Sequence, residues 1–239
     1  MSKLTVTTSW DDGHKLDLKL AELLAKYGLR GTFYITKYYR NPLERWDVVE
    51  IGREHEVGAH TLNHVDLTSV SLLKARDEIA GSKAYLEYLL GHSPSMFCYP
   101  YGEYNESVKQ IVRRCGFSAA RTCQHGGFGP PRDPHEWQIT LHASNGSPLM
   151  TLRMWRKCGL SIRSLCDWET RAKLLFDLAL ERGGVYHLWG HSWEIDKNGE
   201  WDKLERVFGY ISKAKGVRFM TNGEIFADSP PAEAASHGG

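Results

Sequence analysis

The feature that most constrains this chain is a repeated alternation of short apolar runs with longer amphipathic stretches. The apolar runs have the length of single strands, and the stretches between them carry apolar residues at helical spacing. Strands separated by helices of this length are typical of a parallel sheet whose strands are connected by crossover helices. The alternation does not distinguish a closed barrel from an open sheet.

The apolar runs predict strands at 4–10, 31–35, 57–59, 96–99, 117–121, 138–142, 185–189 and 217–220. The amphipathic stretches predict helices at 16–27, 43–55, 72–90, 105–115, 170–181 and 204–214. Residues 124–137 are rich in Gly, Pro and His and predict a loop, whereas residues 144–166 show no clear pattern. We expect both segments to line a binding cleft.

The chain of 239 residues has the length of one larger domain, with no internal repeat and no interdomain linker. Residues 1–228 are therefore expected to form a single domain. Residues 229–239 are rich in Pro, Ala and Gly and are expected to form a flexible tail.

The composition limits the classes of partner. A formal net charge of +1 provides no long-range attraction to nucleic acid or to an anionic membrane. The first residues lack a basic segment followed by a long apolar run, so we expect neither a secretory signal nor a transmembrane span, and a cytoplasmic location. The odd number of cysteines, without a CxxC pair, favours reduced thiols: Cys98, Cys115, Cys123, Cys158 and Cys166.

Four polar clusters lie directly after predicted strands. In chain order they are Asp11–Asp12, His60–His64, Pro100–Gly102 and His191. The carboxyl ends of parallel strands lie on one face of an α/β fold, where sites form. We therefore expect these four segments to meet in one place.

His60 and His64 are four residues apart, so one helical turn would place both imidazoles on the same face. Two histidines with one carboxylate are a common ligand set for zinc and other divalent metals. The alternative is a pair of surface histidines at chance spacing. The pair of aspartates at another strand end favours the metal site.

Asp11 and Asp12 are neighbours on extended or turning backbone, so their side chains point in different directions. One carboxylate can then bind a metal while the other faces a water molecule and acts as a general base. The alternative is an Asp-Asp-Gly turn in which Asp12 caps the helix that begins near Lys15.

The run around His191 offers a second imidazole. His191 lies past the end of its strand, which favours a role as general acid. His187 points to the same side of that strand, and we expect it to be a buried, hydrogen-bonded core residue. Trp189 and Trp193 are candidates for an apolar pocket or a sugar platform, with core packing as the alternative for Trp189.

Tyr101 and Gly102 follow Pro100 at another strand end. Glycine would let the loop backbone approach a ligand, and a backbone N–H there could stabilise a developing oxyanion. The alternative is a simple proline-containing turn.

Together these segments resemble the motifs of the polysaccharide deacetylases, the NodB-homology family that forms carbohydrate esterase family four. The family motifs are Thr-Phe-Asp-Asp-Gly, His-Ser/Thr-x-x-His, Arg-x-Pro-Tyr-Gly and a strand-end Leu-x-His. Their counterparts here are Ser9–Gly13, His60–His64, Cys98–Gly102 and Leu188–His191. Order and spacing match over nearly the whole chain, from Leu4 to about Phe226.

The resemblance implies an α/β fold, a distorted (β/α)7 barrel of the NodB type related to the TIM barrel. It implies that Asp12, His60 and His64 hold a divalent metal, for which we expect Zn²⁺, with Co²⁺, Ni²⁺ or Mn²⁺ as alternatives. It implies Asp11 as general base and His191 as general acid. The implied activity is hydrolysis of an N-acetyl group on an amino sugar or glycan.

Two motifs depart from the family. The Arg of the third motif, which in the family orients the catalytic base, is replaced by Cys98. Arg121, at a neighbouring strand end, is the candidate substitute, and a surface arginine is the alternative. The fourth motif, an Asp-Trp pair, has a weak counterpart in Asp167–Trp168, for which a helix cap followed by a packed ring is the alternative.

Two other functions remain open from the sequence: an allantoin-like cyclic amide hydrolase of the same fold, and a sugar-binding pseudoenzyme. The intact Asp pair, His pair and His191 argue against the pseudoenzyme. Because no export signal is visible, we expect a soluble or lipid-linked N-acetylated sugar inside the cell as substrate. The sequence does not indicate the oligomeric state.

Overall fold

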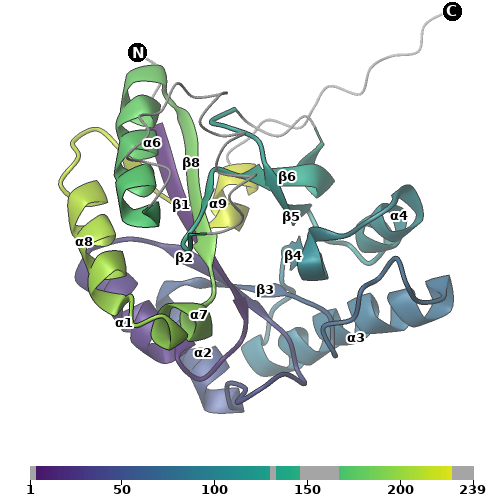
Figure 1. The fold of residues 1–239 in the computed structure, drawn as a ribbon. Coiled ribbons are helices and arrows are strands. Elements are labelled where there is room, and N and C mark those ends of the chain that lie inside the picture. The colour runs from purple at the N-terminus through teal and green to yellow at the C-terminus, as the bar shows by residue number, and fades with distance from the viewer. Residues whose placement is uncertain (1–3, 130–132, 146–166, 228–239) are drawn as a thin grey trace, which may run out of the picture.

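Parallel strands form the centre of the molecule in the computed structural model, which describes residues 4–129, 133–145 and 167–227 (Figure 1). The strands are β1 (Leu4–Asp12), β2 (Gly31–Ile35), β3 (Glu56–Ala59), β4 (Met96–Cys98), β5 (Ala119–His125), β6 (Trp137–Ile139), β7 (Leu141–His142), β8 (Gly184–Gly190) and β9 (Arg218–Phe219). The hydrogen-bonded order is β6-β5-β4-β3-β2-β1-β8-β7, and β9 pairs with the start of β1.

The segment from β6 to β7 brings the two edges of this sheet together. β6 pairs with β5 through Trp137 and Ile139, and β7 pairs with β8 through Leu141 and His142. Between them, the Thr140 N–H donates to the carbonyl of His187 at 2.9 Å. With β6 and β7 taken as one bent strand, seven parallel strands form a nearly closed ring, which confirms the expected distorted (β/α)7 barrel.

Helices surround the ring of strands on its outer side (Figure 1). They are α1 (Asp17–Lys26), α2 (Arg45–Glu54), α3 (Leu72–Leu90), α4 (Glu106–Arg114), α6 (Trp168–Arg182), α7 (Ser192–Lys197) and α8 (Trp201–Ile211). Their buried apolar faces pack against outward-facing strand residues such as Trp10, whose ring meets Phe208 of α8. Burial of this outer layer provides the main hydrophobic stabilisation.

Helix α9 (Asn222–Ala227) contacts β1 and β2 at the end of the barrel opposite the carboxyl ends of the strands. The Asn222 side chain accepts from the Thr7 hydroxyl at 2.8 Å and donates to the Tyr34 hydroxyl at 2.9 Å. Phe226 packs edge-on against Trp137 in the small inner core. These side chains pack inside the barrel at this end, and the carboxyl ends of the strands lie at the opposite end, where sites form.

Several boundaries differ from the sequence-based prediction. β1 includes Asp11 and Asp12, and β5 runs on to His125, so the loop expected from residue 124 begins later. The short helix α7 was missed because six residues give little periodicity. Asp167 caps α6 by accepting from the Thr170 N–H at 3.0 Å, which confirms the alternative of a helix cap for the Asp-Trp pair.

None of the described helices combines the length and apolar character that crossing a bilayer would require. Cys98, Cys115 and Cys123 are free thiols. Cys158, Cys166, most of the segment 144–166 and the expected tail at 229–239 lie outside the described residues.

Candidate active site

The polar segments expected at the strand ends do converge. Their backbone is unusual there: Asp12, Thr61, His64 and Tyr101 all have positive φ angles, of 84°, 65°, 53° and 59°. Residues other than glycine rarely have positive φ angles, and those that do are often found at functional sites, where the surrounding structure holds them in place. These four residues therefore mark the segments that carry the candidate site.

Asp12, His60 and His64 form the first cluster. Asp12 Oδ1 lies 3.3 Å from His64 Nε2 and 3.7 Å from His60 Nε2. The two imidazoles are not on a helix, as the spacing had suggested, because residues 60–64 form an irregular turn with positive φ at Thr61 and His64. That expectation was wrong, although the turn still brings the two rings together, with centroids 4.8 Å apart.

The donor atoms of this cluster fit a metal ion. His60 Nδ1 lies 2.8 Å from the Cys98 carbonyl, which can only accept, so Nδ1 carries the proton and the Nε2 lone pair faces Asp12. Burial lowers the pKa of His60 to about 4, so the ring is neutral near pH 7. Asp12 Oδ1 is buried and has no hydrogen-bond partner among the described residues. A cation would satisfy both the lone pair and the carboxylate.

Asp11 points into the barrel and meets a different partner. The Arg121 guanidinium donates to Asp11 Oδ2, and both side chains are buried. Burial raises the pKa of Asp11, but the charges of Arg121, His60 and His191 outweigh it, so the pKa lies below its usual value. Arg121, expected from the sequence as a substitute for the missing motif arginine, thus contacts the carboxylate that this arginine would orient, and the alternative of a surface arginine was wrong.

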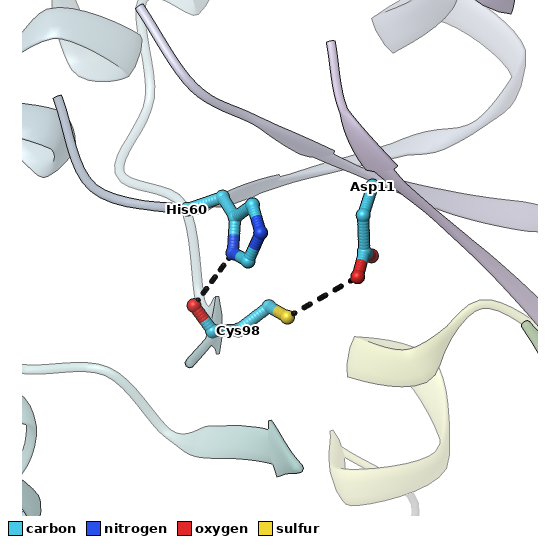
Figure 2. Close-up of side chains that lie close together, drawn as sticks. All are labelled: Asp11, His60 and Cys98. Atoms are coloured by element: carbon cyan, nitrogen blue, oxygen red, sulfur yellow. Dashed lines mark hydrogen bonds between the residues drawn. The ribbon is translucent and has the colours of Figure 1, made fainter. Parts of the chain in front are cut away.

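Cys98 lies between His60 and Asp11. Figure 2 shows His60 bonded to the Cys98 carbonyl and the Cys98 thiol directed at Asp11, at a sulfur-to-oxygen distance of 3.7 Å. Asp11, His60 and Cys98 offer a second set of potential metal ligands. Arg121 Nη2 lies 2.8 Å from the sulfur, however, and burial raises the Cys98 pKa well above its usual value. A protonated thiol beside a guanidinium does not hold a cation, so this set is a hydrogen-bonded support.

His191 follows β8 at the same end of the barrel. Its Nε2 lies 4.0 Å from Asp12 Oδ2, and its Nδ1 lies 3.3 Å from Glu194 Oε2. Burial lowers the His191 pKa, but the Glu194 hydrogen bond and the charges of Asp11 and Asp12 outweigh it, so the pKa is raised. Sequence reasoning missed Glu194, although its position one turn after His191 was a usable signal.

A hydrogen bond to α1 anchors Ser192, the residue next to His191. Ser192, the first residue of α7, donates its hydroxyl to the buried Asp17 at 2.5 Å. Burial raises the Asp17 pKa well above its usual value, which favours the neutral carboxyl. This contact ties the start of α7 to α1.

The two tryptophans have different surroundings. Trp193 donates its indole N–H to Asp12 Oδ2 at 2.8 Å, so it holds a residue of the first cluster. Trp189 is buried, with the Arg121 guanidinium 4.6 Å from its ring centre and the His142 ring stacked at 4.2 Å. This burial favours core packing for Trp189 over the sugar contact expected from the sequence.

The Pro100–Gly102 turn completes the mouth. The Tyr101 ring is exposed and meets the His64 ring edge-on at 4.7 Å. Gly102 has φ 75°, and a Cβ there would lie 2.7 Å from Cys123 Cβ and 2.8 Å from its backbone nitrogen. The turn therefore needs glycine for its close approach to β5, whereas the sequence had suggested an approach to a ligand.

His187 does not belong to the candidate active site. It is buried inside the barrel, and its Nε2 lies 2.8 Å from the Ser9 hydroxyl. Burial lowers its pKa to about 3, which keeps the ring neutral. The prediction of a hydrogen-bonded core histidine is confirmed.

A family model described as polysaccharide deacetylase matches residues 1–120, about half of the chain, including three of the four segments of the site. The chain belongs to the polysaccharide deacetylase family. The matched half carries Asp11, Asp12, His60, His64 and the Pro100–Gly102 turn.

The chain is similar over part of its length to proteins named as peptidoglycan deacetylases. A peptidoglycan-N-acetylglucosamine deacetylase of Bacillus cereus is 26% identical over 136 residues, 55% of this chain and 60% of the relative. A peptidoglycan deacetylase of Helicobacter pylori is 22% identical over 112 residues, 47% of this chain and 38% of the relative. The matched region thus spans 60% or less of the length of these relatives.

Solved structures of the family share the fold. A Mycobacterium smegmatis protein assigned to the polysaccharide deacetylases has a TM-score of 0.68 at 16% identity, covering 95% of this chain and 90% of the other. The Xyl-CE4 domain of a multidomain xylanase from the hindgut metagenome of Trinervitermes trinervoides has a TM-score of 0.62 at 16% identity, covering 95% and 91%. At these identities the likeness concerns the barrel alone.

Proposed function

We propose that this chain is a metal-dependent hydrolase that removes the acetyl group from the nitrogen of an amino sugar in a glycan. The observation that carries the proposal is the meeting of Asp12, His60 and His64 with Asp11 and His191 at one end of the barrel. Family membership and the peptidoglycan deacetylases among the relatives support the same class of reaction.

Asp12, His60 and His64 would hold the metal, and a His2Asp set leaves room for water and substrate. We propose zinc, since imidazole and carboxylate ligands suit it, with cobalt, nickel or manganese as substitutes. When bound, such an ion polarises the substrate carbonyl and makes a nearby water more acidic. Trp193 restrains the Asp12 carboxylate by its hydrogen bond to Oδ2 and leaves Oδ1 for the ion.

Asp11 would accept the proton of the attacking water. Its Oδ2 receives the Arg121 hydrogen bond, whereas its Oδ1 is buried without a hydrogen-bond partner in the described part of the chain. Oδ1 is thus the oxygen available to a water. Arg121 is a positioning residue that fixes the carboxylate and keeps it ionised.

His191 would donate a proton to the departing sugar nitrogen. Glu194 holds Nδ1, so Nε2 faces the cluster. The raised pKa of His191 favours the protonated ring that an acid needs. This leaves Asp11 and His191 with opposite tasks, since the pKa of Asp11 lies below its usual value.

The backbone N–H of Tyr101 would stabilise the oxyanion that develops on the substrate carbonyl. Tyr101 and Gly102 both have left-handed φ angles, of 59° and 75°, in the turn that follows β4. The exposed Tyr101 ring would contact the sugar.

The test is release of acetate from N-acetylated sugars. Purified, zinc-loaded protein would be incubated with N-acetylglucosamine oligomers, peptidoglycan fragments and cyclic amides such as allantoin, and both acetate and ring-opened product would be measured. Acetate from an amino sugar is the expected result. Ring opening without acetate would replace the proposal with a cyclic amide hydrolase, and sugar binding without hydrolysis would indicate a pseudoenzyme. The cytoplasmic location expected from the sequence stays a prediction.

A further inference from the structure

A third group of potential metal ligands lies beside the proposed acid. His142 ends β7, His191 follows β8, and Glu194 is in the first turn of α7. Glu194 Oε2 lies 3.1 Å from His142 Nε2 and 3.3 Å from His191 Nδ1. We call these three residues the His142–Glu194 site. It shares no ligand with the Asp12, His60 and His64 cluster.

Hydrogen bonding does not account for the whole arrangement. His142 Nδ1 lies 2.9 Å from the Ser144 hydroxyl. His142 Nε2 approaches Glu194 to ion-pair distance, yet it is buried and makes no hydrogen bond of acceptable angle to any described residue. The imidazole nitrogen and the carboxylate oxygen are therefore close together without a hydrogen bond between them. A cation bound to both atoms would stabilise this contact.

The spacing suits a small divalent ion. Bonds of 2.0–2.1 Å in a tetrahedral zinc site place neighbouring ligand atoms about 3.3 Å apart. The two nitrogen-to-oxygen distances, 3.1 and 3.3 Å, are close to this edge. All three ligand atoms lie within 4.8 Å of one another. The His142 ring is also restrained, because it stacks on buried Trp189 with an interplanar angle of 19°.

We propose that the His142–Glu194 site binds a second divalent cation, with zinc as the preferred ion, and that this ion inhibits the enzyme. Two imidazoles and one carboxylate are a zinc ligand set in their own right. The ion would replace the hydrogen bond from His191 Nδ1 to Glu194, which orients the ring toward the first cluster. The inhibition rests on the proposed function, whereas the binding of the ion does not.

Zinc binding to the purified protein tests the site directly. Metal-free wild type would be titrated with zinc by calorimetry, and with cobalt by its visible absorption, beside His142→Phe and Asp12→Asn. Phenylalanine keeps a ring to stack on Trp189 but has no ligand nitrogen. We expect two ions per chain in wild type and one in each variant, with the weaker site missing from His142→Phe. One ion in wild type, or equal binding by wild type and His142→Phe, would overturn the proposal.

The proposed inhibition is tested by measuring turnover at increasing zinc concentrations. Wild-type activity should rise as the first site fills and then fall at least ten-fold at zinc concentrations that fill the second. His142→Phe should keep the rise and lose the fall, since His142 takes no part in the proposed reaction. Equal inhibition of both proteins would remove the regulatory claim. Absence of any deacetylation would refute the proposed function and leave the zinc titration to decide on the site.

Discussion

Cys98 on β4 and Arg121 on β5 are direct register partners in the sheet, and the Arg121 guanidinium reaches past the Cys98 sulfur to the Asp11 carboxylate. The family's motif places an arginine at the position of Cys98. In this chain, the neighbouring strand supplies a guanidinium to the Asp11 carboxylate. Because the two residues are paired in the sheet, we expect a guanidinium at either position to reach Asp11.

Exchange of these two residues tests that relationship. Arg121→Met should lower turnover about a hundred-fold, since a small displacement of a catalytic group has that effect. It should also lower the melting temperature, because Asp11 loses its buried partner. The exchange Cys98→Arg with Arg121→Cys should restore most activity. If the exchanged protein folds and binds metal but stays as inactive as Arg121→Met, the position of the guanidinium does not explain its role.

Glu194→Gln should lower turnover about ten- to hundred-fold, a part of the roughly hundred- to ten-thousand-fold contribution of a general acid. Glutamine keeps the size and an acceptor for His191 Nδ1 but removes the charge that raises the His191 pKa. The substrate KM and the affinity of the first metal site should stay unchanged. Unchanged turnover in a protein that still melts like wild type would show that the carboxylate does not assist His191.

Gly102→Ala should cost about 2 kcal/mol of unfolding free energy or more, because its φ is positive and the new Cβ would meet the Cys123 backbone. Gly216→Ala is the matched control, since Gly216 has the same φ of 75° but nothing within 4 Å of an added Cβ. Urea unfolding of both variants measures the difference. Gly102→Ala should also lower turnover by moving the Tyr101 N–H. Equal stabilities would contradict the close approach.

His187 makes stability depend on pH. The folded protein holds this ring neutral, with a pKa of about 3, whereas the unfolded chain takes up a proton below about pH 6.5. The stability from the neutral ring is complete above pH 6.5 and is lost as the pH falls toward 3, at up to about 1.4 kcal/mol per pH unit. Urea unfolding at pH 7, 6 and 5 should show a shallower slope for His187→Gln. Parallel curves for the two proteins would contradict the account.

The strand ends were the most informative part of the sequence. Parallel strands bring their carboxyl ends to one face. The position of each motif directly after a strand therefore predicts that these residues meet: Asp11, Asp12, His60, His64 and His191. Strand alternation likewise separates the two neighbouring aspartates, one turned inward to Arg121 and the other toward the histidines. Both the meeting of the motifs and the separation of the two aspartates can be predicted from the sequence without interatomic distances.

Other features depend on geometry that the sequence does not carry. The partner of Asp11 follows from the register between β4 and β5, and the closure of the barrel follows from the bend between β6 and β7. The turn at His60–His64 looked helical because spacing alone cannot show a positive φ. Glu194 was missed because α7 is too short to show a periodic pattern.

The most direct test compares Asp11→Asn with Asp12→Asn after dialysis at low zinc concentration, with metal content and acetate release measured on the same samples. Asp11→Asn should keep about one zinc per chain and lose turnover, because it removes the base and leaves the ligands. Asp12→Asn should lose both the zinc and the turnover, because the weaker His142–Glu194 site is empty at this zinc concentration. Loss of zinc from Asp11→Asn with retention by Asp12→Asn would contradict the assignment of the two carboxylates.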